Sequence, residues 1–184
     1  SRFDKKMNNQ KKSQQLKVLL VTNYRSDTQY SMLRFANHLL THTDSNRIEY
    51  SEIAPKPVLN RIPSYHKFKK WNGYIDKYIL FPKFLRKELE RIPFNCMHIV
   101  DHSNAVYIPK TQFCPTLLTC HDLIAVQMAQ EKLPEAPKTS GLGKRLQNWI
   151  SQSLTRADYF ACDSRATEKI LHSLIPTAKN KSEV

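Results

Sequence analysis

Two titratable side chains, His121 and Asp122, stand side by side at the end of the apolar run 115–120. A histidine changes charge near neutral pH, so it can move a proton or donate a hydrogen bond to a polar ligand. A carboxylate accepts hydrogen bonds and can hold such a ring or a loop in place. No rule of strand or helix formation asks for this pair after a strand, so we take both residues as candidates for a ligand site.

Three further strand-like runs also end in polar or charged side chains. These are Asn23, Tyr24, Arg25, Ser26 and Asp27 after residues 16–22; Asp101, His102, Ser103 and Asn104 after 97–100; and Asp163, Ser164 and Arg165 after 159–162. The carboxyl ends of parallel strands meet at one edge of a sheet, and open α/β sheets bind their ligands there. The pattern therefore predicts that side chains from four strands converge on one ligand cleft.

A purely structural role is the alternative for each of these residues. A single histidine at a strand end more often caps or packs than binds a ligand. Asp163 and Ser164 precede a helical pattern, where capping explains most such residues, and Asp101 with His102 could simply end a strand at the surface. The convergence of four strand ends favours His121 above the others as a site residue.

Apolar runs of strand length alternate with amphipathic stretches along the chain. Apolar side chains have helical spacing in 30–43, 143–157 and 164–175, and residues 66–92 are also helical in pattern, with a break expected at Pro82. Alternating strands and helices are typical of a parallel sheet covered on both faces, and continuously apolar strands are typical of burial on both. The sequence therefore predicts an α/β fold: a Rossmann-like, doubly wound parallel sheet with helices on both faces.

Three segments follow from this pattern. Residues 1–15 are polar and basic, and we expect a flexible tail there. Residues 16–176 hold the whole α/β pattern and predict a single domain. Residues 177–184 are expected to begin a linker to a second domain.

Composition narrows the classes of partner. The net charge of +13 on 184 residues favours anionic partners such as nucleic acid, phosphorylated ligands or anionic lipid. Only three glycines occur, which excludes a glycine-rich phosphate loop and argues against a dinucleotide-dependent oxidoreductase. The four cysteines lack the spacing of a metal knuckle or redox pair. No apolar run approaches the roughly 18 residues of a membrane span, and we expect a reduced, cytoplasmic protein.

Three stretches taken together resemble a known family. They are HIVDHSNAVYIP (98–109), TLLTCHDLIAV (116–126) and LTRADYFACDSRATEKIL (154–171). These stretches are similar to the N-terminal domain of a family 4 retaining glycosyltransferase of GT-B fold, of the bacterial or cyanobacterial type that assembles polysaccharides. The resemblance covers about residues 16–175.

The resemblance implies a cleft between two Rossmann-like domains. The N-terminal domain would bind the acceptor and close over the sugar, and a C-terminal domain outside this chain would hold most of the nucleotide sugar. The implied reaction transfers a hexose, with UDP-glucose as the favoured donor, to a glycan or lipid-linked acceptor in polysaccharide biosynthesis. The present chain alone is then expected to be inactive, and neither a metal nor another cofactor is expected.

The same resemblance assigns roles to residues of the predicted cleft. His121 matches the histidine that contacts the donor sugar near the reacting centre, and Asp122 matches a neighbour that positions this loop. The relatives often carry glycines in the loop matching 23–27, whereas this chain has none there, so close backbone approach to a phosphate is harder. The substrate-binding candidates are Asn23, Tyr24, Arg25, Ser26, Asp27, Asn104, Asp122, Ser164 and Arg165, and His121 is the catalytic candidate.

Residues 61–91 interleave basic and aromatic side chains. Such a segment could lie on an anionic membrane surface, which would suit a lipid-linked acceptor and a peripheral position at the inner face of the membrane. The alternative is an ordinary pair of helices whose aromatic side chains pack on the sheet while the basic ones face water. The sequence leaves both interpretations open.

A second class of function also stays open. The high positive charge suits a polyanion- or nucleic-acid-binding α/β module without catalysis. No RNA- or DNA-binding motif is visible, however, and the transferase interpretation expects no nucleic acid partner. The binding module predicts stacking aromatic side chains on an exposed face and binding that salt strongly weakens.

Overall fold

The computed structural model describes residues 15–27, 29–59, 66–130 and 141–184, with the backbone alone at 66–70. Within these ranges, six parallel strands form one sheet in the order β2-β1-β3-β4-β5-β6. The strands are β1 (Leu16–Val21), β2 (Ile48–Ile53), β3 (Cys96–Ile99), β4 (Thr116–Cys120), β5 (Tyr159–Cys162) and β6 (Ser182–Glu183). The chain passes from β1 to β2 on one side and returns to β3 on the other side of β1.

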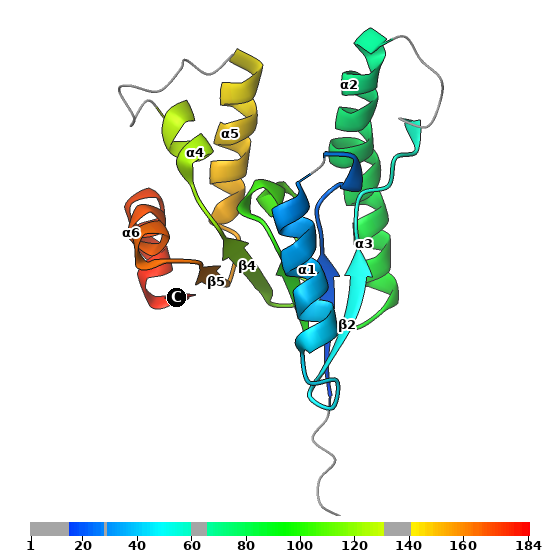
Figure 1. Ribbon diagram of the computed structural model, residues 1–184, viewed down its shortest axis with the longest axis vertical. Helices are drawn as coiled ribbons and strands as arrows, with labels where there is room; N and C mark the ends of the chain where they lie inside the picture. The colour runs from blue at the N-terminus through cyan, green and yellow to red at the C-terminus, as the bar shows by residue number, and fades with distance from the viewer. Residues whose placement is uncertain (1–14, 28, 60–65, 131–140) are drawn as a thin grey trace, which may run out of the picture.

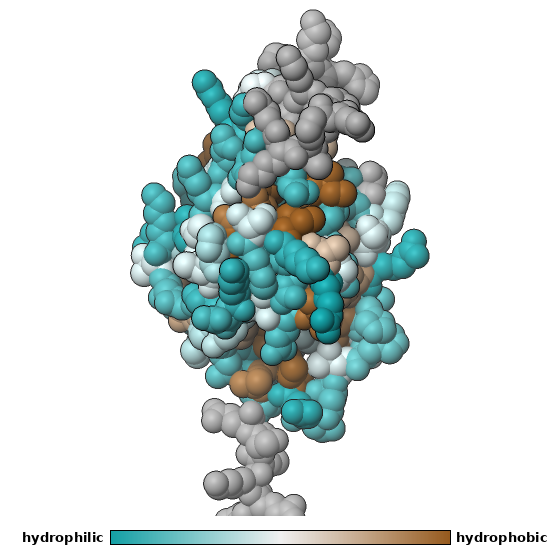
Figure 2. Space-filling view, turned by 90° about the vertical axis from the view of Figure 1, so that its left-hand side faces the viewer, coloured by the Kyte–Doolittle hydropathy of each residue, from teal (hydrophilic) through white to brown (hydrophobic). Residues whose placement is uncertain are grey.

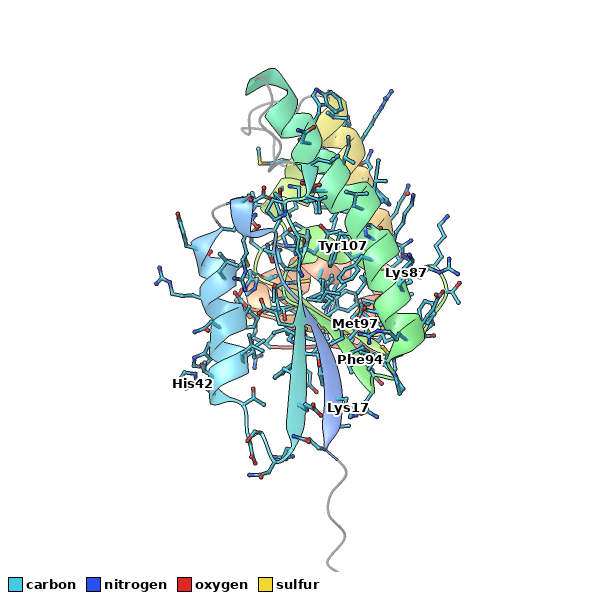
Figure 3. The ribbon with its side chains drawn as sticks, turned by 90° about the vertical axis from the view of Figure 1, so that its right-hand side faces the viewer. Lys17, His42, Lys87, Phe94, Met97 and Tyr107 are labelled. Carbon is cyan, nitrogen blue, oxygen red and sulfur yellow. The ribbon has the colours of Figure 1, made fainter. Side chains whose placement is uncertain are left out.

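Helices cover both faces of this sheet. The helices are α1 (Tyr30–His42), α2 (His66–Ile75), α3 (Phe81–Arg91), α4 (Ile124–Ala129), α5 (Gly141–Leu154) and α6 (Arg165–Leu174). Figures 1 and 3 show α1 and α3 on opposite sides of β1 and β2. The predicted Rossmann-like, doubly wound α/β fold is confirmed.

Successive residues of β1 point into two different cores, as the period of two in a strand requires. Leu19 and Val21 belong to the large core that also holds buried residues of α3, α5 and α6. Leu20 packs on the other face with Ala36 of α1 and Val100. Burial of each such side chain contributes about 1.5–3 kcal/mol, which explains why β1 is apolar on both sides.

The predicted break at Pro82 is wrong, because the helix continues from α2 into α3. The two are joined by a π-helical turn, η3 (Asp76–Leu80), in which the N–H of Phe81 donates to the carbonyl of Asp76, five residues earlier. A proline inside a helix lacks an N–H for the normal bond and its ring presses on the preceding turn. The wider turn directly before Pro82 accommodates both effects, so the chain stays helical.

Residues 177–184, predicted to begin a linker, instead continue the folded domain. Residues Pro176–Asn180 form a short 3-10 helix, η5, and β6 then pairs with β5 in parallel. Ala178 is fully buried in the large core, so the domain continues through β6. Two residues are too few to show a strand pattern in a sequence. The predicted tail, 1–15, lies outside the described residues except for Gln15.

Two short 3-10 helices stand at the carboxyl edge of the sheet. They are η1 (Arg25–Asp27), after β1, and η4 (His102–Tyr107), after β3.

The N-cap predicted at Ser164 is confirmed, because its hydroxyl accepts a hydrogen bond from the backbone N–H of Thr167 at 3.1 Å. This bond satisfies a donor that the first turn of α6 would otherwise leave unpaired.

The exterior has the character expected of a basic α/β domain. The face shown in Figure 2 is largely hydrophilic, with hydrophobic patches near its upper part, right of its centre and at its lower end. Among the described residues, no helix is long and apolar enough to cross a membrane. The four cysteines carry free thiols, and Cys120 and Cys162 lie opposite each other in β4 and β5, both buried.

Candidate functional site at the carboxyl edge of the sheet

The candidate site lies where the direction of winding reverses. The strand order places β2 on one side of β1 and β3 on the other. The connection after β1 therefore runs toward one edge of the sheet, and the connection after β3 runs toward the other. Open α/β sheets bind their ligands at such a switch point, outside the carboxyl ends of the strands. The loop beginning at Asn23 and the segment beginning at Asp101 meet there.

A buried hydrogen-bond network joins these two loops. The side-chain amide of Asn23 donates to Oδ2 of Asp101 at 2.8 Å, and its carbonyl accepts from Nδ2 of Asn104 at 3.0 Å. All three residues are at most 8% exposed. Two candidates named from the sequence, Asn23 and Asn104, are therefore in direct contact, and Asp101 links them. The network fixes both loops relative to each other.

Asp101 carries a negative charge inside this network. Burial alone would raise the pKa of its carboxyl group, but the adjacent His102 ring and hydrogen bonds from Ser103 and Asn23 hold that pKa well below its usual range. The Ser103 hydroxyl donates to Oδ2 at 2.6 Å, and its backbone N–H donates to Oδ1 at 3.1 Å. Nδ1 of His102 lies 3.2 Å from Oδ1. A carboxylate with this many donors is a fixed anchor rather than a proton carrier.

His121 sits at the end of β4 between two acceptors. Its Nδ1 lies 2.7 Å from Oδ2 of Asp163, and its Nε2 lies 2.9 Å from the carbonyl oxygen of Val100. Phe35 of α1 packs edge-on against the ring, with centroids 4.9 Å apart. The side chain is 13% exposed, whereas Asp163 is 48% exposed. The ring is thus contacted on three sides, and one of its partners, the Asp163 carboxylate, is half exposed to solvent.

These contacts set the hydrogen-bonding state of the ring. Both acceptors can be satisfied together only when both ring nitrogens of His121 carry a proton, because a neutral imidazole has one N–H. The resemblance to glycosyltransferases implies that His121 contacts the donor sugar. In this structure Nε2 instead faces the Val100 carbonyl, so a ligand would have to compete with that oxygen for the same N–H.

The backbone of His121 is fixed from the neighbouring helix. The hydroxyl of Thr167 in α6 donates to the His121 carbonyl at 3.1 Å, and Thr167 itself is buried. The Ser164 hydroxyl caps the same turn of α6. The helix that follows β5 therefore positions the histidine that follows β4.

The remaining residues of the first loop point away from this cluster. Tyr24 is buried, and its hydroxyl donates to Asp76 Oδ2 at 3.3 Å. Arg25 is exposed and lies 3.5 Å from Glu52 at the end of β2. Asp27 accepts from Lys77 of η3 at 2.7 Å. These contacts dock the loop onto β2 and η3.

The other predicted residues lie on the rim. Ser26 and Arg165 are exposed, in η1 and at the first position of α6. Asp122 is exposed, and its Oδ1 accepts from the backbone N–H of Ile124 at 3.2 Å, at the start of α4. Ser164 uses its hydroxyl in capping. The structure thus brings Asn23, Asn104 and His121 to one edge and leaves these four at its border.

Asp101 and Asp163 were not among the catalytic or substrate-binding candidates named from the sequence. Both belong to the strand ends predicted to converge, but each also had a structural explanation, Asp101 as a surface strand end and Asp163 as part of a helix cap. The available signal was position: each directly follows a strand that neighbours β1 or β4 in the sheet. Strand order, which local sequence patterns do not give, brings Asp101 against Asn23 and Asp163 against His121.

A second histidine, His98 of β3, is buried on the same side of the sheet. Its Nε2 lies 2.8 Å from the hydroxyl of Thr119. Burial, reinforced by the nearby His121, lowers the pKa of His98 from 6.5 to about 4. The ring therefore stays neutral in the folded protein over the range in which an unfolded histidine takes up a proton.

Folding stability should consequently decline in mild acid. Above pH 6.5 the His98 ring is neutral in both states and its contribution is complete. As the pH falls toward 4, the unfolded chain binds a proton that the folded chain does not, which costs up to about 3 kcal/mol. Urea unfolding from pH 7 to 4 measures this slope. His98→Gln should flatten it, His42→Gln on the exposed end of α1 should not, and an unchanged slope in His98→Gln would contradict the assignment.

The basic aromatic segment divides into two parts. Phe81, Leu85 and Leu89 of α3 are buried against the sheet, as the ordinary-helix interpretation of 61–91 predicts. Trp71, Tyr74 and Tyr78 instead line a groove shared with α5. Residues 61–65 lie outside the described part of the chain. The membrane interpretation of residues 61–91 therefore stays a prediction.

No group of three or more histidine, cysteine, aspartate or glutamate side chains within the described ranges could hold a metal ion. Comparison with known proteins adds no assignment. No family model matches the chain, and no curated protein matches it significantly.

Proposed function

We propose that this chain is the N-terminal, acceptor-side domain of a retaining glycosyltransferase of GT-B fold. The observation that carries the proposal is the polar cluster at the carboxyl edge: the His121–Asp163 pair contacts the Val100 carbonyl, and the Asn23–Asp101–Asn104 network begins at the next residue. The motifs around 98–109, 116–126 and 154–171 resemble this family, and a ligand site at this edge is what the family requires. A C-terminal GT-B domain would complete the cleft.

The reaction that we propose transfers a hexose from a nucleotide sugar, with a UDP-sugar favoured. Positive charge develops at the anomeric carbon and negative charge on the leaving diphosphate. Hydrogen-bond donors fixed in advance stabilise the negative charge on the diphosphate because they need not reorganise during the reaction. His121, held by Asp163 and by the Thr167 hydroxyl of α6, would donate a hydrogen bond to a sugar hydroxyl and so position the anomeric carbon. Asp163 would fix the orientation of the ring.

The buried network would act as the rigid floor of the site. Asn23, Asp101 and Asn104 satisfy one another, so their main role would be to hold the loops after β1 and β3. The exposed Arg25 and Arg165 would supply positive charge near the diphosphate. Arg25 lies next to Glu52, and a phosphate would compete with that carboxylate for the guanidinium group.

Nucleotide release from a panel of donors tests this proposal. The native protein extended downstream of Val184 would be given UDP-glucose, UDP-N-acetylglucosamine and GDP-mannose in turn. We expect release of one nucleotide above the background of a heat-inactivated sample, from one donor in preference to the others. A folded protein that releases no nucleotide from any of the three would argue against a hexosyltransferase.

A polyanion-binding module is the second candidate. Two observations favour it: the net charge of +13, and tryptophan side chains that are 57% exposed at Trp71 and 40% exposed at Trp149. Stacking of bases on such rings and contacts to phosphates would give binding without catalysis. Tight oligonucleotide binding that weakens steeply with salt, together with no nucleotide release, would favour this module over the transferase.

A further inference from the structure

An open groove of about 340 Å³ lies between the α2–η3 segment and α5. Figure 1 shows α2 and α5 rising on either side of the upper part of the molecule, beyond the carboxyl ends of the strands. The residues lining the groove are Trp71, Tyr74, Tyr78, Leu142, Gly143, Arg145, Leu146 and Trp149. This set, called the aromatic groove below, has the size of a small ligand site.

The walls of the aromatic groove are built by rings packed on rings. Tyr74 stacks on Tyr78 with centroids 5.9 Å apart, and Trp71 meets Tyr74 edge-on at 6.1 Å. Tyr78 contacts Trp149 of α5 at 5.6 Å. Leu142, at the rim, is 52% exposed. A continuous apolar surface that stays partly open to water is typical of a binding site.

The lining favours an apolar ligand over a sugar. Arg145 is the charged member of the lining set, and the set contains neither a carboxylate nor a side-chain amide. The hydroxyl groups of a saccharide would lose water without gaining enough acceptors and donors, which costs free energy for each unpaired group. A hydrocarbon chain loses nothing comparable and gains from leaving water.

The lining also favours a single anionic group over a nucleic acid. Strands of DNA or RNA need a track of cations along the backbone and separate ring faces for successive bases. Here the rings are packed against one another, and the lining set offers one cation, Arg145, which is exposed. One guanidinium group beside an apolar wall matches one phosphate on a hydrocarbon chain.

We propose that the aromatic groove binds the hydrocarbon chain of a phosphate-bearing lipid, with its phosphate at Arg145. The groove adjoins the segment that docks the loop after β1. Lys77, next to Tyr78, binds Asp27 of the loop after β1 at 2.7 Å and lies 5.6 Å from the centre of the Tyr78 ring.

The use of this lipid rests on the proposed transfer function. In that setting the bound lipid is the acceptor, and the groove selects lipid-linked acceptors over free glycans. Binding itself does not depend on transfer. Failure of lipid binding with nucleotide release intact would remove only the groove assignment, whereas binding without any release would leave the groove and remove the transferase.

The chain provides its own probe of the aromatic groove. It has two tryptophans, Trp71 and Trp149, and both line the groove. Their fluorescence would be followed during titration of the whole chain with hexyl, octyl and decyl phosphate, each below its micelle concentration. We expect a saturable blue shift, with affinity rising about fourfold for each added methylene group. Inorganic phosphate should give no shift.

Matched variants assign the binding to the groove. Leu142→Asp should reduce the affinity for decyl phosphate at least tenfold, whereas Ile79→Asp, at an equally exposed position of η3 outside the lining, should not change it. Arg145→Gln should lower the affinity for octyl phosphate to that for octyl glucoside, while leaving octyl glucoside binding unchanged.

Three results would overturn the proposal. Absence of a saturable shift with decyl phosphate would exclude a chain-binding groove. Equal affinity for hexyl and decyl phosphate, or a shift with inorganic phosphate alone, would show an anion site without a chain site. A saturable shift with an oligothymidylate and none with decyl phosphate would assign the groove to nucleic acid.

Discussion

Replacing His121 by alanine should lower kcat/KM for sugar transfer by about 100-fold or more. The ring is held between Asp163 Oδ2 and the Val100 carbonyl, so its position is fixed before the substrate binds, and the sugar would take the Nε2 donor from the Val100 carbonyl. Alanine removes that donor and leaves the strand end unchanged. The measurement is initial rates of nucleotide release by the native, extended protein with its preferred donor.

Two companion variants separate the ring from its surroundings. Asp163→Asn keeps a hydrogen-bond acceptor but removes the charge beside Nδ1, so the ring is held less firmly and activity should fall. His172→Ala, on α6 with Nε2 at 2.7 Å from Ser182, should retain full activity. Equal activity of His121→Ala and His172→Ala would show that His121 serves packing alone.

Replacing Asp101 by alanine should destabilise the fold by about 3–5 kcal/mol. The carboxylate accepts from Asn23, from Ser103 twice, and lies 3.2 Å from His102. Alanine leaves these buried groups without their partner, and each unpaired donor costs free energy. A loss of this size is a large part of the 5–15 kcal/mol that separates typical folded and unfolded states.

Urea unfolding at pH 7 measures this effect, with Asp163→Ala as the matched control. Asp163 is half exposed, so its loss should cost less than about 1 kcal/mol. Because the folded pKa of Asp101 is depressed, its contribution is present above the unfolded pKa near 4 and is lost as the pH falls below it. A loss within 1 kcal/mol for Asp101→Ala would refute a central role for the network.

The fold could be predicted because its determinants are local. Continuous apolar runs such as 16–22 and helical spacing such as 143–157 need no knowledge of distant residues. Their alternation implies a parallel sheet with helices on both faces. The two errors have local causes too. Pro82 normally ends a helix, and the π turn that tolerates it has no sequence signature. Strand β6 is too short to give a pattern.

The candidate site could be predicted only in part, because the order of the strands in the sheet decides which of its side chains meet. The position of His121 after β4 was visible, as were Asn23 and Asn104 after β1 and β3. Their partners were not, since Asp163 equally resembles a capping residue and Asp101 a surface strand end. Tyr24 and Asp27 belong to the predicted loop, but the structure shows that they dock it onto η3, a contact between distant segments.

The most direct test of a retaining transferase follows the sugar itself. The native, extended protein would be incubated with UDP-α-D-glucose labelled with ¹³C at C1, and the anomeric signals would be followed by NMR. Transfer with retention predicts loss of the donor signal, release of UDP and a new α-anomeric signal. An unchanged donor in the presence of folded protein and lipid-linked or glycan acceptors, or a β-anomeric product, would contradict the assignment of this sheet edge to a retaining glycosyltransferase.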